Sequence, residues 1–188
     1  MHSSGFAPVL YPRDFCDLDE ELKSLHLHST RTHDWALINS GQRVVDTHFV
    51  FPLMHLDASD PKNYYFDATD AAINLAQNIG MKIFYRMGTS IEHTKDVHFN
   101  TKPPADQKKY AEVMAGIVRH YTQGWANGFQ WDIQYWEIWN EPDLSGGRCW
   151  EGTKEEFISL FVTILKRLKE EFPSIKIGGP ALCGPNED

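Results

Sequence analysis

The sequence has few cysteines, and their arrangement argues against two classes of cross-linked protein. Only three are present in 188 residues, Cys16, Cys149 and Cys183. They are odd in number, widely spaced and form no Cys-x-x-Cys pair, so neither a disulfide framework nor a thiolate zinc site is expected. Nothing in their neighbourhood activates a thiol as a nucleophile, and we expect them to be free.

Long apolar runs and an excess of positive charge are also missing. No stretch approaches the roughly 20 apolar residues of a membrane span, and residues 1–15 lack the basic start and apolar run of a secretory signal. A cytoplasmic location is the default expectation, with secretion as the alternative for an incomplete N-terminus. The formal net charge of −8 disfavours nucleic acid and anionic membranes as partners, because both need clustered Lys and Arg.

Glycine-rich phosphate loops of the G-x-G-x-x-G and G-x-x-x-x-G-K-[ST] types do not follow any expected strand, which argues against nucleotide binding. What is present is a strict alternation of short apolar runs and amphipathic segments. This alternation predicts a parallel α/β sheet in one domain. The expected strands are 6–10, 29–34, 81–87, 135–141 and 175–182, and the expected helices are 14–27, 67–79, 105–123 and 154–172.

Local signals set the expected helix ends. Asp67 is predicted to cap the second helix, and Gly80 to end it. Gly124 is predicted to stop the third helix. Thr153 and Glu156 form a capping-box pattern at the start of the fourth.

Polar residues gather where the expected strands run into the following loops, at 31–33, 88–93 and 140–141. That is the face at which (β/α)8 barrels place their chemistry, so a barrel is favoured over an open doubly wound sheet. A full barrel takes roughly 250 residues, and about four or five strands fit here. The expected fold is an incomplete (β/α)8 TIM barrel with about strands 1 to 5, residues 1–188 being the N-terminal part of one catalytic domain.

The tract Tyr-Trp-Glu-Ile-Trp-Asn-Glu-Pro-Asp at 135–143 is the most informative part of the chain. It reads as a buried strand that ends in an amide and a carboxyl, Asn140 and Glu141. A carboxyl desolvated by neighbouring tryptophans holds its proton to higher pH, which suits a general acid for glycosidic bond cleavage. Asn140 can donate a hydrogen bond to a substrate hydroxyl. Rings such as Trp139 and Trp150 suit a sugar cleft or, equally, core packing.

Glycoside cleavage usually needs a second carboxylate, and the sequence offers no convincing one. Glu137 lies four residues from Glu141 along the strand, roughly 13 Å at about 3.3 Å per residue. This distance exceeds the separation of the two catalytic carboxyl groups in both retaining and inverting glycosidases, which is at most about 9.5 Å. Glu137 is therefore interpreted as a structural carboxylate, and Asp143 as a loop or capping residue. An inverting or metal-dependent hydrolase that uses Asp143 remains an alternative.

Trp139-Asn140-Glu141-Pro142 resembles the acid/base motif of the clan of retaining barrel glycosidases. Three further segments match in order and spacing: Arg31-Thr32-His33, Phe84-Tyr85-Arg86-Met87-Gly88 and Lys176-Ile177-Gly178-Gly179-Pro180. With them the chain resembles glycoside hydrolase family 39, which holds β-xylosidases and α-L-iduronidases. The resemblance runs from about Phe6 to the C-terminus.

The resemblance implies retaining, β-xylosidase-like hydrolysis of an oligosaccharide or glycoside. We expect no cofactor and no metal. The resemblance also implies that Glu141 is the acid/base, that Asn140 binds the 2-hydroxyl and that His33 binds the sugar before the cleaved bond. The family's nucleophile, a Glu on the seventh strand, would lie outside this chain, so the isolated chain is expected to be inactive. A non-catalytic carbohydrate-binding remnant is the alternative from another functional class.

Where the third strand ends, xylosidases of the family tend to carry an acidic residue, and here Arg86 stands nearby. It could bind a uronic acid, as in an α-L-iduronidase, or pair with Glu137. Trp139 and Trp150 complete the expected substrate-binding set. Plainer readings stay open for several residues: a paired structural role for Glu141, a core or capping role for His33, and ordinary polar or packing roles for His26, His28, His93, His98 and Arg148.

Overall fold

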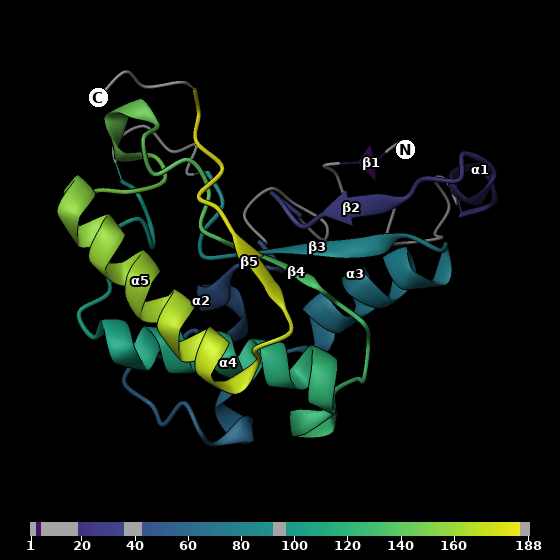
Figure 1. The fold of residues 1–188 in the computed structure, drawn as a ribbon, viewed down its shortest axis with the longest axis horizontal. Helices are drawn as coiled ribbons and strands as arrows, with labels where there is room; N and C mark the ends of the chain where they lie inside the picture. Colours follow the sequence, from purple (N-terminus) through teal and green to yellow (C-terminus); the bar gives the residue numbers. More distant parts are fainter. Residues whose placement is uncertain (1–2, 5–18, 36–42, 92–96, 185–188) are drawn as a thin grey trace.

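The computed structural model describes residues 3–4, 19–35, 43–91 and 97–184. Its strands form one parallel sheet in the order β1-β2-β3-β4-β5 (Figure 1). Their bounds are β1 (Ser3–Ser4), β2 (Ser29–Arg31), β3 (Lys82–Met87), β4 (Tyr135–Ile138) and β5 (Lys176–Gly178). The strands lie side by side in the same order in which they occur in the sequence. A doubly wound sheet reverses its strand order at a switch point, so this uninterrupted order is that of a barrel segment.

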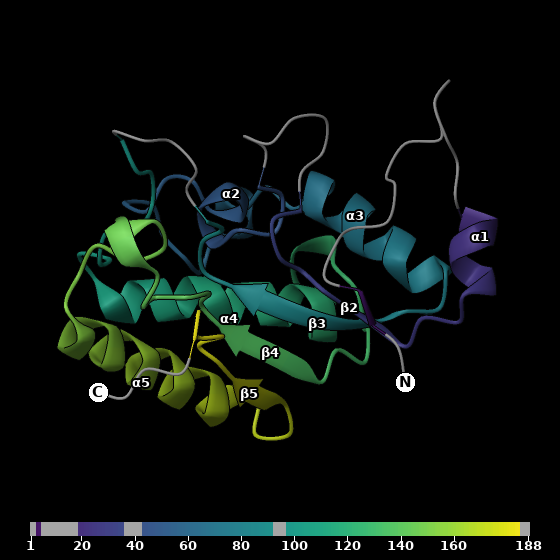
Figure 2. The ribbon, with the colours of Figure 1, turned by 90° about the horizontal axis from the view of Figure 1, so that it is seen from above.

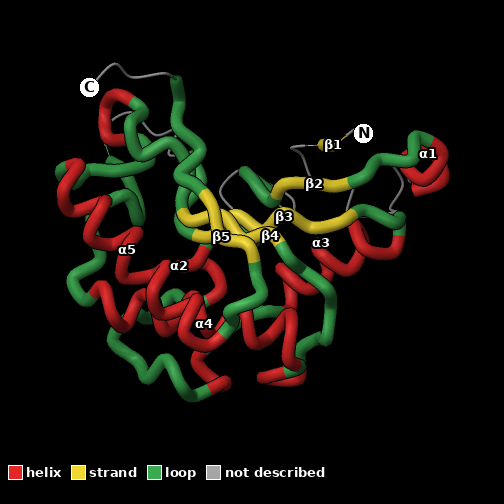
Figure 3. Tube along the Cα trace, viewed as in Figure 1, coloured by secondary structure: helices red, strands yellow, loops and turns green. Residues whose placement is uncertain are grey.

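Helices connect successive strands. They are α1 (Asp19–Ser24), α2 (Thr47–Val50), α3 (Asp67–Asn78), α4 (Gln107–Gln123) and α5 (Lys154–Glu171), with short 3-10 turns at Pro61–Asn63, Trp125–Asn127 and Ser145–Gly147. Figure 3 shows α3, α4 and α5 on the same side of the strands, and Figure 2 shows α5 running beside α4. No helix in the described ranges is both long and apolar enough to cross a bilayer.

The two faces of the sheet carry different residues because side chains alternate along a strand. On the helix side, Tyr85 of β3 packs against Trp136 of β4 and Tyr121 of α4, with ring centroids 5.0 and 5.6 Å apart. On the other side, Phe84 stacks on Tyr135 at 5.8 Å. That second face also holds the side chain of Arg86, so it corresponds to the interior of a barrel.

Helix ends follow the local signals in three cases and depart from them in one. α3 ends at Asn78, and Gly80, with φ 88°, follows its C-cap residue Ile79. Thr153 and Glu156 form the capping box of α5, and Gly124 ends α4 with φ 74°. The prediction that Asp67 caps α3 is wrong, because the N-cap is Phe66, which has helical backbone angles and no side-chain cap. Phe66 stacks on His120 with ring centroids 3.5 Å apart, and this packing fixes the residue before the helix.

Several expected elements are shorter in the structure. The strand expected over 135–141 ends at Ile138, and the strand expected over 29–34 ends at Arg31. The helix expected over 14–27 is described only as α1. The strand expected over 6–10 lies outside the described residues. His93 lies outside them as well.

Candidate active site

The end of β4 has an unusual backbone. Trp139 and Glu141 have φ of 72° and 40°, and Asn140 lies between them. Non-glycine residues seldom adopt the left-handed region, and those that do cluster at functional sites. The N–H of Glu141 donates to the carbonyl of Ala181 at 2.9 Å, which fixes the tract to the loop after β5. The backbone thus stops the strand and sets the direction of Asn140 and Glu141.

A glycine on the neighbouring strand end permits this arrangement. Gly88 follows β3 with φ 107°, and a Cβ added there would lie 2.7 Å from Cε3 of Trp139. The N–H of Trp139 donates to the carbonyl of Met87 at 2.9 Å. The close approach of β3 and β4 at the site therefore requires a residue without a side chain at position 88.

Asn140 is held by contacts at both ends of its amide. Its Oδ1 accepts a hydrogen bond from Nη2 of Arg31 at 2.8 Å, and its Nδ2 lies 3.8 Å from Sγ of Cys149. Because the guanidinium can only donate, the amide oxygen must face Arg31. The amide nitrogen therefore faces the other way, as a donor to a sugar hydroxyl would need.

Arg31 also binds Glu137. Its Nε donates to Oε2 of Glu137 at 2.7 Å, and its Nη2 lies 2.5 Å from the same oxygen. The guanidinium reaches across β3 from β2 to β4. Glu137 is therefore a structural carboxylate, as the spacing argument predicted.

Arg86 does not pair with Glu137, and that alternative is wrong. Its guanidinium is fully buried and donates through Nη2 to Oδ1 of Asp46 at 2.7 Å and to Oγ of Ser90 at 2.9 Å. The carboxylate of Asp46 also accepts from the main-chain N–H of Ser90 at 2.8 Å. Sequence reasoning missed Asp46. The signal available in the sequence was an acidic residue directly after two apolar residues, Val44 and Val45. Both valines are buried in the structure.

The carboxyl of Glu141 is half-buried, and within the described ranges it takes part in no hydrogen bond or ion pair. Asp143 differs. Its carboxylate accepts from the main-chain N–H of Cys183 at 2.9 and 3.2 Å, joining the loops that follow β4 and β5. Asp143 therefore has the loop role expected of it, whereas the carboxyl of Glu141 has no such contact among the described residues.

His33 is held at the end of β2 in its neutral form. Burial lowers its pKa to about 4, with Arg86 and Arg31 acting in the same direction and Asp34 opposing them. Nε2 of His33 lies 3.6 Å from Oδ2 of Asp34. Its Nδ1 is buried and has no hydrogen-bond partner among the described residues. A neutral imidazole offers one donor and one acceptor, which suits a hydroxyl group.

Comparison with known proteins decides the family. Residues 14–186 match the model of glycosyl hydrolases family 39. The chain belongs to this family.

Two curated β-xylosidases are similar to this family 39 chain. The one from Geobacillus stearothermophilus is 29% identical over 92 residues, which is 47% of this chain and 17% of the relative. The one from Caldicellulosiruptor saccharolyticus is 28% identical over 128 residues, 63% of this chain and 25% of the relative. The chain thus spans a quarter or less of the length of these relatives.

A solved structure confirms the fold. The glucosidase from Croceicoccus marinus superposes with a TM-score of 0.77 at 29% identity, covering 96% of this chain and 36% of the glucosidase. The family 39 chain is therefore an α/β fold with the strand order of an incomplete TIM barrel.

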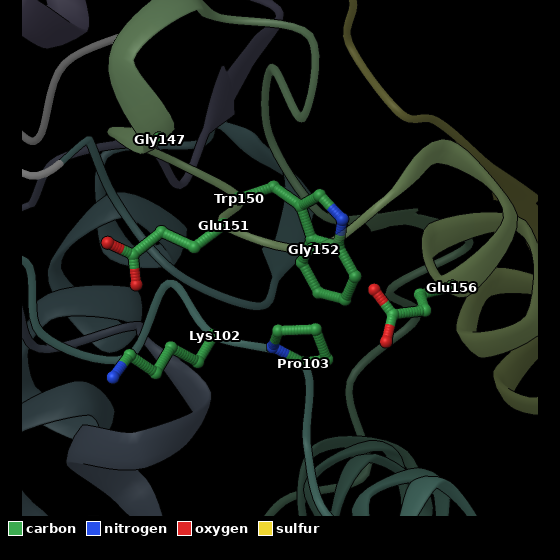
Figure 4. A pocket seen from close by; sticks show the side chains of 7 residues that line it. All are labelled: Lys102, Pro103, Gly147, Trp150, Glu151, Gly152 and Glu156. Atoms are coloured by element: carbon green, nitrogen blue, oxygen red, sulfur yellow. The ribbon is translucent and has the colours of Figure 1, made fainter.

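The two tryptophans predicted to bind substrate are packed side chains in the family 39 chain. Trp139 and Trp150 meet edge to face at 5.3 Å, and each is at most 5% exposed. Trp150 lines a pocket of about 900 Å³ where the loops after β3 and β4 meet. Figure 4 shows its indole beside Pro103, with Lys102 and Glu151 on one side and Glu156 on the other.

The remaining candidates are His98, His26, His28 and Arg148. Nδ1 of His98 lies 3.3 Å from Oε1 of Glu151, which bridges two loops near this pocket. His26 and Arg148 are exposed, and His28 is half-buried. Within the described residues, no three His, Cys, Asp or Glu side chains are placed to hold a metal.

Proposed function

We propose that this chain forms the general acid/base part of a retaining, β-xylosidase-like active site, with Glu141 as the proton donor. The observation that carries this proposal is the state of Glu141: its backbone is fixed in the left-handed region beside Asn140, and its carboxyl is uncommitted within the described ranges. The curated relatives are β-xylosidases, which supports a xyloside as the substrate.

In the proposed reaction, Glu141 protonates the departing glycosidic oxygen while a carboxylate nucleophile attacks the anomeric carbon. The bond to the aglycone breaks, and a covalent glycosyl-enzyme forms. Glu141, now ionised, then removes a proton from water, which attacks the anomeric carbon and releases the sugar with retained configuration. Asn140 donates to the 2-hydroxyl, and this contact strengthens as positive charge develops on the ring. His33, neutral, contacts the same sugar.

The nucleophile is assigned to residues outside this chain. The two acidic residues nearest Glu141 in sequence are committed elsewhere, Glu137 to Arg31 and Asp143 to the main chain of Cys183. Neither is free to attack an anomeric carbon or to activate a water. This distribution of contacts argues against the inverting alternative with Asp143 and for a partner carboxylate on a later barrel strand.

The proposal is tested with a protein that contains this chain together with the later barrel strands. Glu141→Gln keeps the side-chain shape and removes the proton. We expect kcat/KM to fall by roughly 10²–10⁴-fold for alkyl xylosides, the range of general acid catalysis. A much smaller fall is expected for aryl xylosides with acidic phenols, which need little protonation. Equal falls for both substrates would remove Glu141 from the acid role.

Substrate preference and turnover by the isolated chain test the proposal further. Matched aryl β-xylosides and β-glucosides differ only in the hydroxymethyl group on C5, and the proposal expects the xyloside to be preferred. The isolated 188-residue chain is expected to show no turnover. A protein with all barrel strands that binds xylosides without cleaving them would instead be a carbohydrate-binding remnant.

A further inference from the structure

We propose that Cys149 is a positioning residue for Asn140, one that orients the amide while leaving an N–H free for a sugar hydroxyl. This inference rests on the proposed function. It concerns a residue that the sequence patterns did not connect with the site.

Two contacts from Cys149 converge on the tract that carries the chemistry. Its Sγ lies 3.8 Å from Nδ2 of Asn140, and its carbonyl accepts from Nε1 of Trp139 at 2.9 Å. Trp139 and Asn140 are consecutive, and all three residues are almost completely buried. Residue 149 therefore contacts both residues that precede Glu141, from a loop that leaves the site and returns to it.

The chemistry of the thiol suits this role. Arg31 fixes the oxygen of the Asn140 amide, so both N–H bonds of Nδ2 point away from the guanidinium. One of them faces Cys149. Sulfur is a weak acceptor, so it aligns the amide without binding that N–H as strongly as an oxygen would. The second N–H remains for substrate.

The protonation state of Cys149 supports the same role. Burial raises the pKa of its thiol to about 12. The hydrogen bond from Asn140 lowers this pKa in part, and the nearby charge of Glu141 raises it. The sulfur is therefore a neutral thiol at ordinary pH. A thiolate would hold the amide through a charge-assisted bond and compete with the substrate.

The contact itself can be measured on the 188-residue chain without any turnover. In ¹⁵N NMR spectra, the side-chain amide signals of Asn140 are identified by their loss in Asn140→Asp. Cys149→Ala should shift these signals, whereas the matched control Cys183→Ala should not. Cys183 is exposed, and its hydrogen bonds to Asp143 come from its main-chain N–H. Unmoved Asn140 signals in Cys149→Ala would overturn the inference.

The functional consequence is measured on the protein with all its barrel strands. Cys149→Ala should lower kcat/KM on an aryl xyloside by about 2- to 10-fold, the span of one hydrogen bond. Cys149→Ser, which restores an acceptor, should recover most of the loss. On the matching 2-deoxyxyloside the effect of Cys149→Ala should vanish, because the hydroxyl that Asn140 binds is absent.

The outcomes separate this inference from the function on which it depends. An inactive wild type would refute the proposed function, and this inference with it. An active wild type with equal losses on both sugars would refute the inference alone, because a general packing defect does not distinguish the 2-hydroxyl. Unchanged kcat/KM on the xyloside would refute it as well.

Discussion

The guanidinium of Arg31 donates to the amide oxygen of Asn140 at 2.8 Å, across 109 positions of sequence. The same guanidinium binds Glu137. One side chain on β2 therefore fixes both the structural carboxylate of β4 and the amide at the end of that strand. Orientation of the site therefore depends on an ion pair inside the sheet.

Arg31→Met should destabilise the protein by about 2–4 kcal/mol, because it leaves Glu137 largely desolvated without a cation. The value lies below that of a fully buried pair because 26% of the Arg31 side chain is exposed. Urea denaturation of Arg31→Met, Glu137→Gln and the double variant forms a thermodynamic cycle. The double variant should lose clearly less than the sum of the single losses. Strictly additive losses would show that the two residues are not coupled.

Gly88→Ala should disturb the site through Trp139, since its new methyl group would lie 2.7 Å from the indole. Gly80→Ala is the matched control, with φ 88° and nothing within 4 Å of the added Cβ. The free energy of unfolding of the control should fall by about 1–2 kcal/mol, because alanine is strained in the left-handed backbone region. The free energy of unfolding of Gly88→Ala should fall by roughly 1–3 kcal/mol more than that of the control, because the added methyl group overpacks the site. Equal losses in thermal denaturation would mean that Trp139 moves away without cost.

Local signals in the sequence were sufficient for the elements that depend on local contacts. The capping box of α5 and the glycine that ends α4 lie within a few residues of what they stabilise. The cap predicted at Asp67 failed because packing of Phe66 on His120 decides the backbone there. A distant contact overrode a local preference.

The sequence pointed to candidate residues for the site but not to the contacts that hold them. The Asn140–Glu141 pair and the structural role of Glu137 followed from the motif and from strand spacing. The partners did not, because Arg31, Asp46 and Cys149 reach the site through tertiary contacts that leave no periodic pattern in the sequence. The left-handed backbone at Trp139 and Glu141 was equally hidden, since neither residue type favours that conformation.

His33 should make stability depend on pH. Its pKa is about 4 in the folded protein, below the ordinary value of 6.5, so the unfolded chain binds more protons between these values. The contribution of neutral His33 to the free energy of unfolding is complete above about pH 6.5 and is lost as the pH falls toward 4. His33→Gln should therefore lose less stability than the wild type between pH 7 and pH 4.5 in urea denaturation. A His33 imidazole that titrates near pH 6.5 in NMR spectra would contradict this.

An ion-pair network joins α4 to α5 far from the site. Glu171 accepts from Arg119 at 2.8 Å and from Arg167 at 2.6 Å. The hydrogen bond from Arg119 is the main cause that lowers the pKa of Glu171, so its stabilisation is present at neutral pH and lost as the pH falls below about 4.5. Glu171→Gln should cost about 1 kcal/mol at pH 7 in low salt.

Its neighbour Glu170 is exposed and serves as the matched control. Glu170→Gln should change the free energy of unfolding by less than about 0.5 kcal/mol. If both variants lose the same amount, the effect comes from net charge and not from the contacts between the helices.

The central claim is that Glu141 is the acid/base of a retaining glycosidase. The most direct measurement is rescue of Glu141→Ala by azide, made on the protein with all its barrel strands and an aryl xyloside with a good leaving group. Azide needs no general base, so it should attack the glycosyl-enzyme, accelerate turnover and yield the β-xylosyl azide with retained configuration. A Glu141→Ala variant that azide does not accelerate, or that yields the α-azide, would contradict the account.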